Sequence, residues 1–131
     1  MNNRAFRDKE KDYPYLTFCL FKDDEELIYK NSTQEKDMRW LQYVYIFVQH
    51  TRNEKNNTLT PEEKEELNIQ VENHISEKLE IYTPQITKHI PMLNDLLQKL
   101  QDEADEQKIS VAYLAQKICV SYIIRNRLHK T

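Results

Sequence analysis

The chain of 131 residues contains no glycine, although average usage of about 7% predicts roughly nine. A P-loop, a dinucleotide-binding turn and a nucleophile elbow all need glycine, because a side chain blocks positive φ or close approach to phosphate. The usual EF-hand loop also depends on a glycine at its sharp turn. We therefore expect none of these nucleotide-binding, hydrolytic or calcium-binding sites.

Cysteine and histidine are also scarce. Cys19 and Cys119 form no C-x-x-C pair, so we expect two buried free thiols in a reducing cytosol, without zinc-ribbon or thioredoxin-type chemistry. The four histidines show neither H-E-x-x-H nor Glu-x-x-His spacing, so we expect no metal and no cofactor. The carboxylates are predicted to lie on exposed helix faces, where nothing adjusts a pKa for acid–base catalysis. The sequence therefore predicts a protein that is not an enzyme and has no small-molecule substrate.

Long hydrophobic runs are missing too. No stretch approaches the ~20 apolar residues of a membrane-spanning helix, and residues 1–12 are too highly charged for a signal peptide. We therefore expect a cytoplasmic protein with no membrane partner. Abundant Lys, Glu, Asn, Ile and Tyr beside only four alanines are typical of an AT-rich genome, which favours a phage, a mobile element or an AT-rich bacterium.

Apolar residues recur at helical spacing along most of the chain. We predict a charged, mobile arm at residues 1–12 and a single, mainly α-helical domain at 13–131. Thr60-Pro61-Glu62-Glu63 is the strongest local signal, because it combines a capping box with a proline in the first turn. Pro91 is expected to kink or restart the helix that contains it, and residues 102–108 are expected to form an acidic connector. The four predicted helices form a bundle and span about 32–52, 60–82, 86–100 and 110–128. Ser32 or Thr33 is expected to cap the first of them and Ser110 the last.

The N-terminal apolar segment fits two structures. Residues 15–21 are rich in aromatic and β-compatible side chains, and after four acidic residues the segment 27–29 is apolar again. This pattern fits a small β-hairpin or a short helix. We favour a helix or irregular packing slightly, since two isolated strands are marginally stable.

Residues 109–121, ISVAYLAQKICVS, resemble the first helix and turn of a helix-turn-helix DNA-binding motif. The resemblance implies a recognition helix at 122–130. Arg125 and Arg127 of that helix would reach phosphates or guanine edges. The candidate nucleic-acid-binding residues are Lys117, Arg125, Arg127 and Lys130. Cys119 stands where glycine normally makes the turn, and one uninterrupted amphipathic helix accounts for the same residues. We favour that single helix.

Charge is segregated along the chain. Residues 61–80 carry seven glutamates against two lysines, whereas residues 110–131 carry four cations and no acid. The acidic helix could imitate a phosphate backbone, but a charge run on a helix usually marks a solvated face.

Aromatic residues crowd the helix predicted at 32–52. Trp40, Tyr43 and Tyr45 cannot all share one buried face, and protein interfaces are enriched in such side chains. We expect these three residues to contribute to a partner-binding surface. The sequence thus predicts a non-enzymatic protein-binding module (an accessory, adaptor or inhibitor) that contacts another protein or a second copy in a homodimer. The alternative is a DNA-binding transcriptional regulator that uses the C-terminal basic segment.

Overall fold

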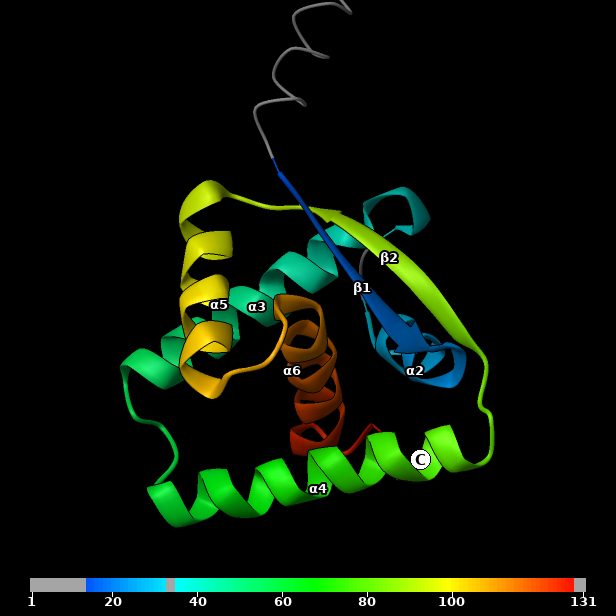
Figure 1. Ribbon diagram of the computed structural model, residues 1–131. Helices are drawn as coiled ribbons and strands as arrows, with labels where there is room; N and C mark the ends of the chain where they lie inside the picture. The colour runs from blue at the N-terminus through cyan, green and yellow to red at the C-terminus, as the bar shows by residue number, and fades with distance from the viewer. Residues whose placement is uncertain (1–13, 33–34, 129–131) are drawn as a thin grey trace, which may run out of the picture.

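The computed structural model describes residues 14–32 and 35–128. The expected mainly helical fold is confirmed (Figure 1). The small β element, one of the two alternatives for the N-terminal segment, is present, so the slightly favoured helix or irregular packing is wrong for residues 15–21. The predicted arm at 1–12 lies outside the described residues. In chain order the elements are β1 (Tyr15–Phe21), α2 (Lys22–Lys30), the short 3₁₀ helix η1 (Lys36–Met38), α3 (Trp40–Lys55), α4 (Pro61–Glu80), β2 (Gln85–Pro91), α5 (Asn94–Gln107) and α6 (Val111–Arg125).

The two strands come from distant parts of the chain. β1 pairs with β2 in an antiparallel register that runs from Tyr15 opposite Pro91 to Phe21 opposite Gln85. Residues 27–29, the candidate second strand, lie in α2 instead. The prediction of helix at residues 86–91 is wrong, because a spacing of four between Ile86 and Ile90 also places both on one face of a strand. Helix α5 then runs to Gln107, so the predicted connector at 102–108 is almost entirely helical.

Strand β1 alternates strictly between the core and solvent. Leu16, Phe18 and Leu20 are buried, whereas the residues between them are exposed. Cys19 is therefore exposed and only Cys119 is buried, so the prediction of two buried thiols is wrong for Cys19. The period of two in a strand turns this thiol to the outer face.

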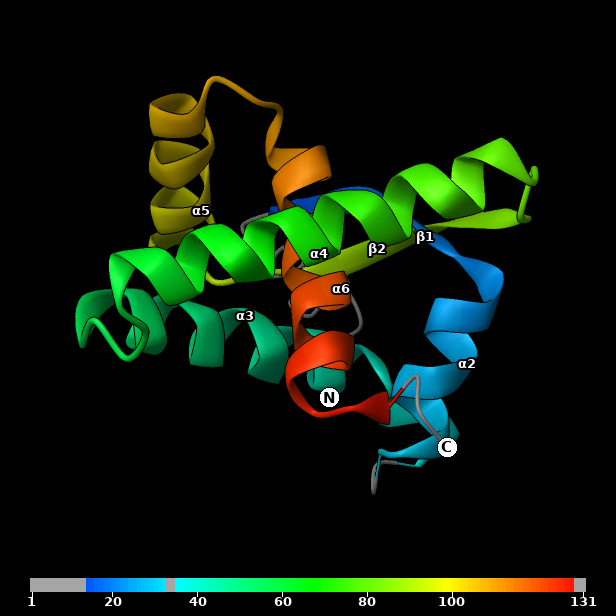
Figure 2. The same cartoon turned by 90° about the horizontal axis from the view of Figure 1, so that it is seen from below.

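Helix α6 is the central element of the fold. It contacts β1, α2, α3, α4 and α5, and Figures 1 and 2 show the other elements arranged around it. Ser110 caps it by accepting a hydrogen bond from the backbone N–H of Tyr113 at 3.1 Å, as the sequence predicts. The helix runs without interruption from Val111 to Arg125, and Cys119 in its middle is fully buried. The two-helix interpretation of this segment is therefore wrong.

Helix α3 begins later than predicted. Its first residue is Trp40, preceded by η1, and no side chain caps it. Thr33, one of the two expected caps, lies outside the described residues. The inner face of α3 meets β1 through edge-to-face ring contacts of Phe18 with Tyr43 at 5.9 Å and with Phe47 at 5.7 Å. These rings form the centre of the main core.

The chain ends its helices without glycine. Positive φ occurs at Asn57, Tyr82, Lys108 and Arg127, directly after α3, α4, α5 and α6. At Tyr82 the backbone N–H groups of Tyr82 and Thr83 donate to the carbonyls of Leu79 and Lys78 at 3.1 and 3.0 Å. This Schellman arrangement normally has glycine at the left-handed position. Within the described residues no helix is both long and apolar enough to cross a bilayer.

Candidate interaction surface

Helix α4 lies across α6 and is attached to the rest of the fold by one narrow face (Figures 1 and 2). Val71 and Ile75 are the buried residues of this helix. They pack in a small cluster, separate from the main core, with Phe21, Val120 and Ile124. Most of the 20 residues of α4 are exposed, so this helix has the largest share of free surface among the long helices.

A buried ion cluster holds the C-terminal half of α4 against α2. Both carboxylate oxygens of Asp24 lie 3.0 Å from Nε2 of His74. Nζ of Lys78 reaches Asp24 and Asp23, each at 2.8 Å. The Asp24 side chain is fully buried, and His74 and Lys78 are 15% and 17% exposed. Burial alone raises the pKa of Asp24, but the hydrogen bonds from His74 and Lys78 outweigh it and hold that pKa below its usual value.

This cluster was not predicted from the sequence. The carboxylates were expected on exposed helix faces, and the acidic run that contains Asp24 is typical of a turn or a helix N-terminus. Its burial arises only because α4 crosses α2 and places a histidine and a lysine against it. One signal was present in the sequence. His74 and Lys78 are four residues apart and therefore on one face of a helix, beside the apolar stripe that contains Ile75.

Apolar side chains gather in solvent where α4 ends. Leu79 is 52% exposed, Ile81 75% and Tyr82 91%. We name these three residues the apolar tip. Figure 2 shows the turn between α4 and β2 that carries them at the outer end of the molecule. Tyr82 is held at φ +55°, a left-handed conformation that costs a residue with a Cβ atom roughly 1–2 kcal/mol.

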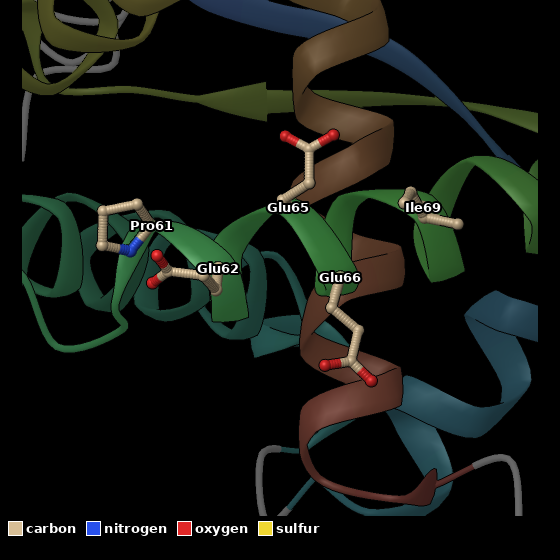
Figure 3. Close-up of a pocket in the computed structure, with 5 residues that line it drawn as sticks. All are labelled: Pro61, Glu62, Glu65, Glu66 and Ile69. Atoms are coloured by element: carbon tan, nitrogen blue, oxygen red, sulfur yellow. The ribbon is translucent and has the colours of Figure 1, made fainter.

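The outward face of α4 is acidic. Positions 62, 66, 69, 73, 76 and 80 recur at intervals of three and four and line one side of the helix. At the N-terminal end Pro61, Glu62, Glu65, Glu66 and Ile69 border a shallow, open hollow of about 430 Å³ (Figure 3). Glu62, Glu65, Glu66, Glu77 and Glu80 form no ion pair with any described residue. We name this side of α4 the outer face.

The inner side of α4 faces a second, larger groove. It encloses about 1050 Å³ between α4 and the helices α3, α5 and α6. Its floor includes Leu67, Tyr113 and Ile118. Most of the charged residues that line it pair with one another, and the two that do not, Glu65 and Arg125, are of opposite sign. This groove therefore presents no single sign of charge. The pairs are Lys64–Glu54 at 2.7 Å, His50–Glu103 at 2.8 Å and Lys117–Glu72 at 3.6 Å.

The predicted partner-binding aromatics divide between core and surface. Tyr43 is completely buried, so its assignment to an exposed surface is wrong. Position 43 lies on the same side of α3 as Phe47, the side that faces β1. Trp40 and Tyr45 are 37% and 56% exposed, but five residues separate them, so they point in different directions around α3. They do not form one patch.

The predicted nucleic-acid-binding cations are likewise dispersed. Lys117 is largely buried, pairs with Glu72 and lies 5.6 Å above the ring of Tyr113. Arg125 and Arg127 are exposed and form no ion pair with the described residues. Lys130 lies outside the described residues.

His74 and Cys119, whose side chains are of types used in catalysis, are hydrogen-bonded or buried. Among the described residues His74 hydrogen-bonds to Asp24 alone, with no hydroxyl or thiol beside it. Cys119 is sealed in the core, where burial raises the pKa of its thiol far above the ordinary value. Within residues 14–32 and 35–128, no three His, Cys, Asp or Glu side chains are grouped so that they could hold a metal ion.

Comparison with protein families, with curated protein sequences and with solved structures finds no match to this chain. Its function is therefore inferred from its own residues.

Proposed function

We propose that this protein is a non-enzymatic protein-binding module, an accessory, adaptor or inhibitor, and that it binds its partner through the apolar tip. The observation that carries the proposal is the 91% exposure of Tyr82 in a left-handed conformation beside the exposed Ile81. Glycine at this position would relieve the backbone strain and remove the exposed ring. Strain and exposed apolar surface that reduce stability are typical of sites retained for binding.

Affinity capture with matched variants tests this proposal. The whole chain is immobilised and exposed to extract from the producing cells, in parallel with Ile81→Ser/Tyr82→Ser and with Leu93→Ser. Leu93 is a large apolar residue that is 57% exposed at the N-cap of α5, so its variant controls for non-specific hydrophobic binding. We expect one protein to be retained by the wild type and by Leu93→Ser and to be lost with the double variant. Equal retention by all three chains, or by none, would contradict the proposal.

One observation favours DNA binding as a second candidate function. Arg125 is the last residue of α6 and Arg127 follows two positions later, and both are exposed without a carboxylate partner in the described region. Fluorescence anisotropy with mixed-sequence duplex DNA, at low and near-physiological salt, tests it. Saturable binding would support this function if the slope of log K against log salt concentration became shallower by about 1.8 in Arg125→Gln/Arg127→Gln. Absence of binding at low salt would dismiss it, and we expect that absence.

A further inference from the structure

We infer that the partner surface bound by the apolar tip has an apolar pocket with a basic rim, and that this rim contacts the outer face of α4. This inference rests on the proposed function and adds the chemical class of the partner.

The apolar tip supplies the anchor. Aromatic side chains that insert into pockets dominate many protein interfaces, and the ring of Tyr82 is almost entirely free in solvent. Ile69 on the outer face provides a second exposed apolar contact. A helix of 20 residues is about 30 Å long at 1.5 Å per residue. The tip and the outer face therefore form one elongated surface, long enough for a specific interface.

The negative charge of the outer face favours a partner with a positively charged surface. The five unpaired glutamates of the outer face have no cation among them, since both lysines of α4 are committed elsewhere. Lys64 pairs with Glu54, and Lys78 is bound to Asp23 and Asp24. An acidic or neutral partner would leave these carboxylates repelled or desolvated without compensation. A basic rim would pair with them and accelerate association.

A second copy of the chain fits this surface less well. It would bring an identical acidic outer face, and each chain carries a net charge of −3. Two such faces repel when they approach each other, because like charges in an interface are unfavourable. The charge therefore points to a different, basic protein.

A designed peptide pair tests the inference with the whole chain. One fluorescent amphipathic peptide of about five helical turns carries leucines on one face and lysines on the other, and its partner peptide has glutamates in place of the lysines. Binding is followed by anisotropy in about 0.05 M and about 0.3 M NaCl. Glu65→Gln/Glu66→Gln is compared with Asp105→Asn/Glu106→Gln, which removes two adjacent exposed acids of α5 instead. Ile81→Ser/Tyr82→Ser removes the anchor.

We expect the lysine peptide to bind, the glutamate peptide not to bind, and salt to weaken the complex. Neutralising Glu65 and Glu66 should weaken binding by roughly threefold to tenfold, and the α5 variant should change it less than about twofold. Loss of the anchor should abolish it.

Equal binding of both peptides, lost only with the anchor variant, would overturn the basic-partner inference and leave the proposed function standing. Equal weakening by the two charge variants would overturn it as well, because the attraction would then be non-specific. Sedimentation velocity supplies a third check. A concentration-dependent dimer that Ile81→Ser/Tyr82→Ser abolishes would identify a second copy as the occupant and overturn the inference.

Discussion

Nε2 of His74 on α4 lies 3.0 Å from each of the two carboxylate oxygens of Asp24 on α2. This contact joins two helices through residues that are 50 positions apart in the chain. Together with the narrow stripe of Val71 and Ile75, it fixes the position of the helix that carries the proposed binding surface. The Asp24–His74–Lys78 cluster therefore has a structural role. It fixes the orientation of the outer face and is not part of that face.

Removing the buried carboxylate should destabilise the protein. Asp24→Asn removes the buried negative charge and one of the two acceptor oxygens that His74 and Lys78 share. Breaking a buried ion pair typically costs about 3 kcal/mol or more. Urea unfolding measures the change. The control is Glu54→Gln, whose pair with Lys64 is well exposed and should contribute less than about 1 kcal/mol. Similar losses for both variants would show that Asp24 does not hold α4.

Asp24 should also make the free energy of unfolding depend on pH in the acid range. The pKa of Asp24 is lower in the folded chain than its ordinary value of 3.8, so the folded state binds this proton less tightly than the unfolded state does. The resulting stabilisation is complete above the ordinary pKa and is lost as pH falls through the folded pKa. We expect the free energy of unfolding to drop below about pH 4, and to drop less steeply in Asp24→Asn. Parallel profiles would contradict this assignment.

Lys78 makes the opposite contribution. Desolvation alone lowers its pKa, but hydrogen bonds to Asp23 and Asp24 prevail and raise it above 10.5. Its stabilisation is therefore complete below the ordinary value and is lost as pH rises through the folded pKa. The free energy of unfolding of the wild type and of Lys78→Met, compared at alkaline pH, measures this loss of stabilisation.

Glycine at the left-handed helix ends should stabilise the chain. Lys108 has φ +59° and stands at the Schellman end of α5, where glycine avoids the steric cost of a Cβ atom. We expect Lys108→Gly to raise the free energy of unfolding by about 1 kcal/mol and Tyr82→Gly to do the same. Lys99→Gly, inside α5, should instead destabilise by about 1 kcal/mol. Thermal unfolding would contradict the assignment if Lys108→Gly behaved like Lys99→Gly.

The buried phenol of Tyr43 should be dispensable. Its hydroxyl forms no hydrogen bond with the described residues, and its ring packs edge-to-face on the ring of Tyr29 with the centroids 5.9 Å apart. Burial raises the pKa of this phenol far above its ordinary value. Tyr43→Phe should therefore be neutral or stabilising, by up to about 1 kcal/mol. Tyr29→Phe removes the acceptor of a 2.8 Å bond from Lys88 and should destabilise by roughly 1–2 kcal/mol.

The two thiols should react at very different rates. Cys19 is exposed on the outer face of β1, whereas Cys119 is buried with a raised pKa. Only the thiolate reacts rapidly with alkylating agents. We expect one equivalent of iodoacetamide to be incorporated at Cys19 in native protein and a second at Cys119 only in denaturant. Native labelling of Cys119, detected by peptide mass spectrometry, would contradict the packing of α6.

Local signals predicted those parts of the fold that local interactions decide. In the capping box the backbone N–H of Glu63 donates to the Thr60 hydroxyl at 3.2 Å, and the backbone N–H of Thr60 donates to the Glu63 carboxylate at 3.0 Å. Ser110 caps α6. Both signals depend on residues three positions apart, so the printed sequence is sufficient. The candidate surface was only partly foreseen. The glutamates of residues 61–80 were recognised, whereas the partner-binding surface was predicted at Trp40, Tyr43 and Tyr45 of α3 and not at the apolar tip.

The sequence by itself determined the helical class and the positions of α4 and α6, because spacing and caps act within a few residues. Only the tertiary structure decided that residues 85–91 pair with β1, that Tyr43 and Asp24 are buried, and that Ile81 and Tyr82 are left in solvent. Each of these depends on which surface another element covers. An apolar pattern shows which residues can be buried, but the packing of α4 on α2 and α6 determines which of them are.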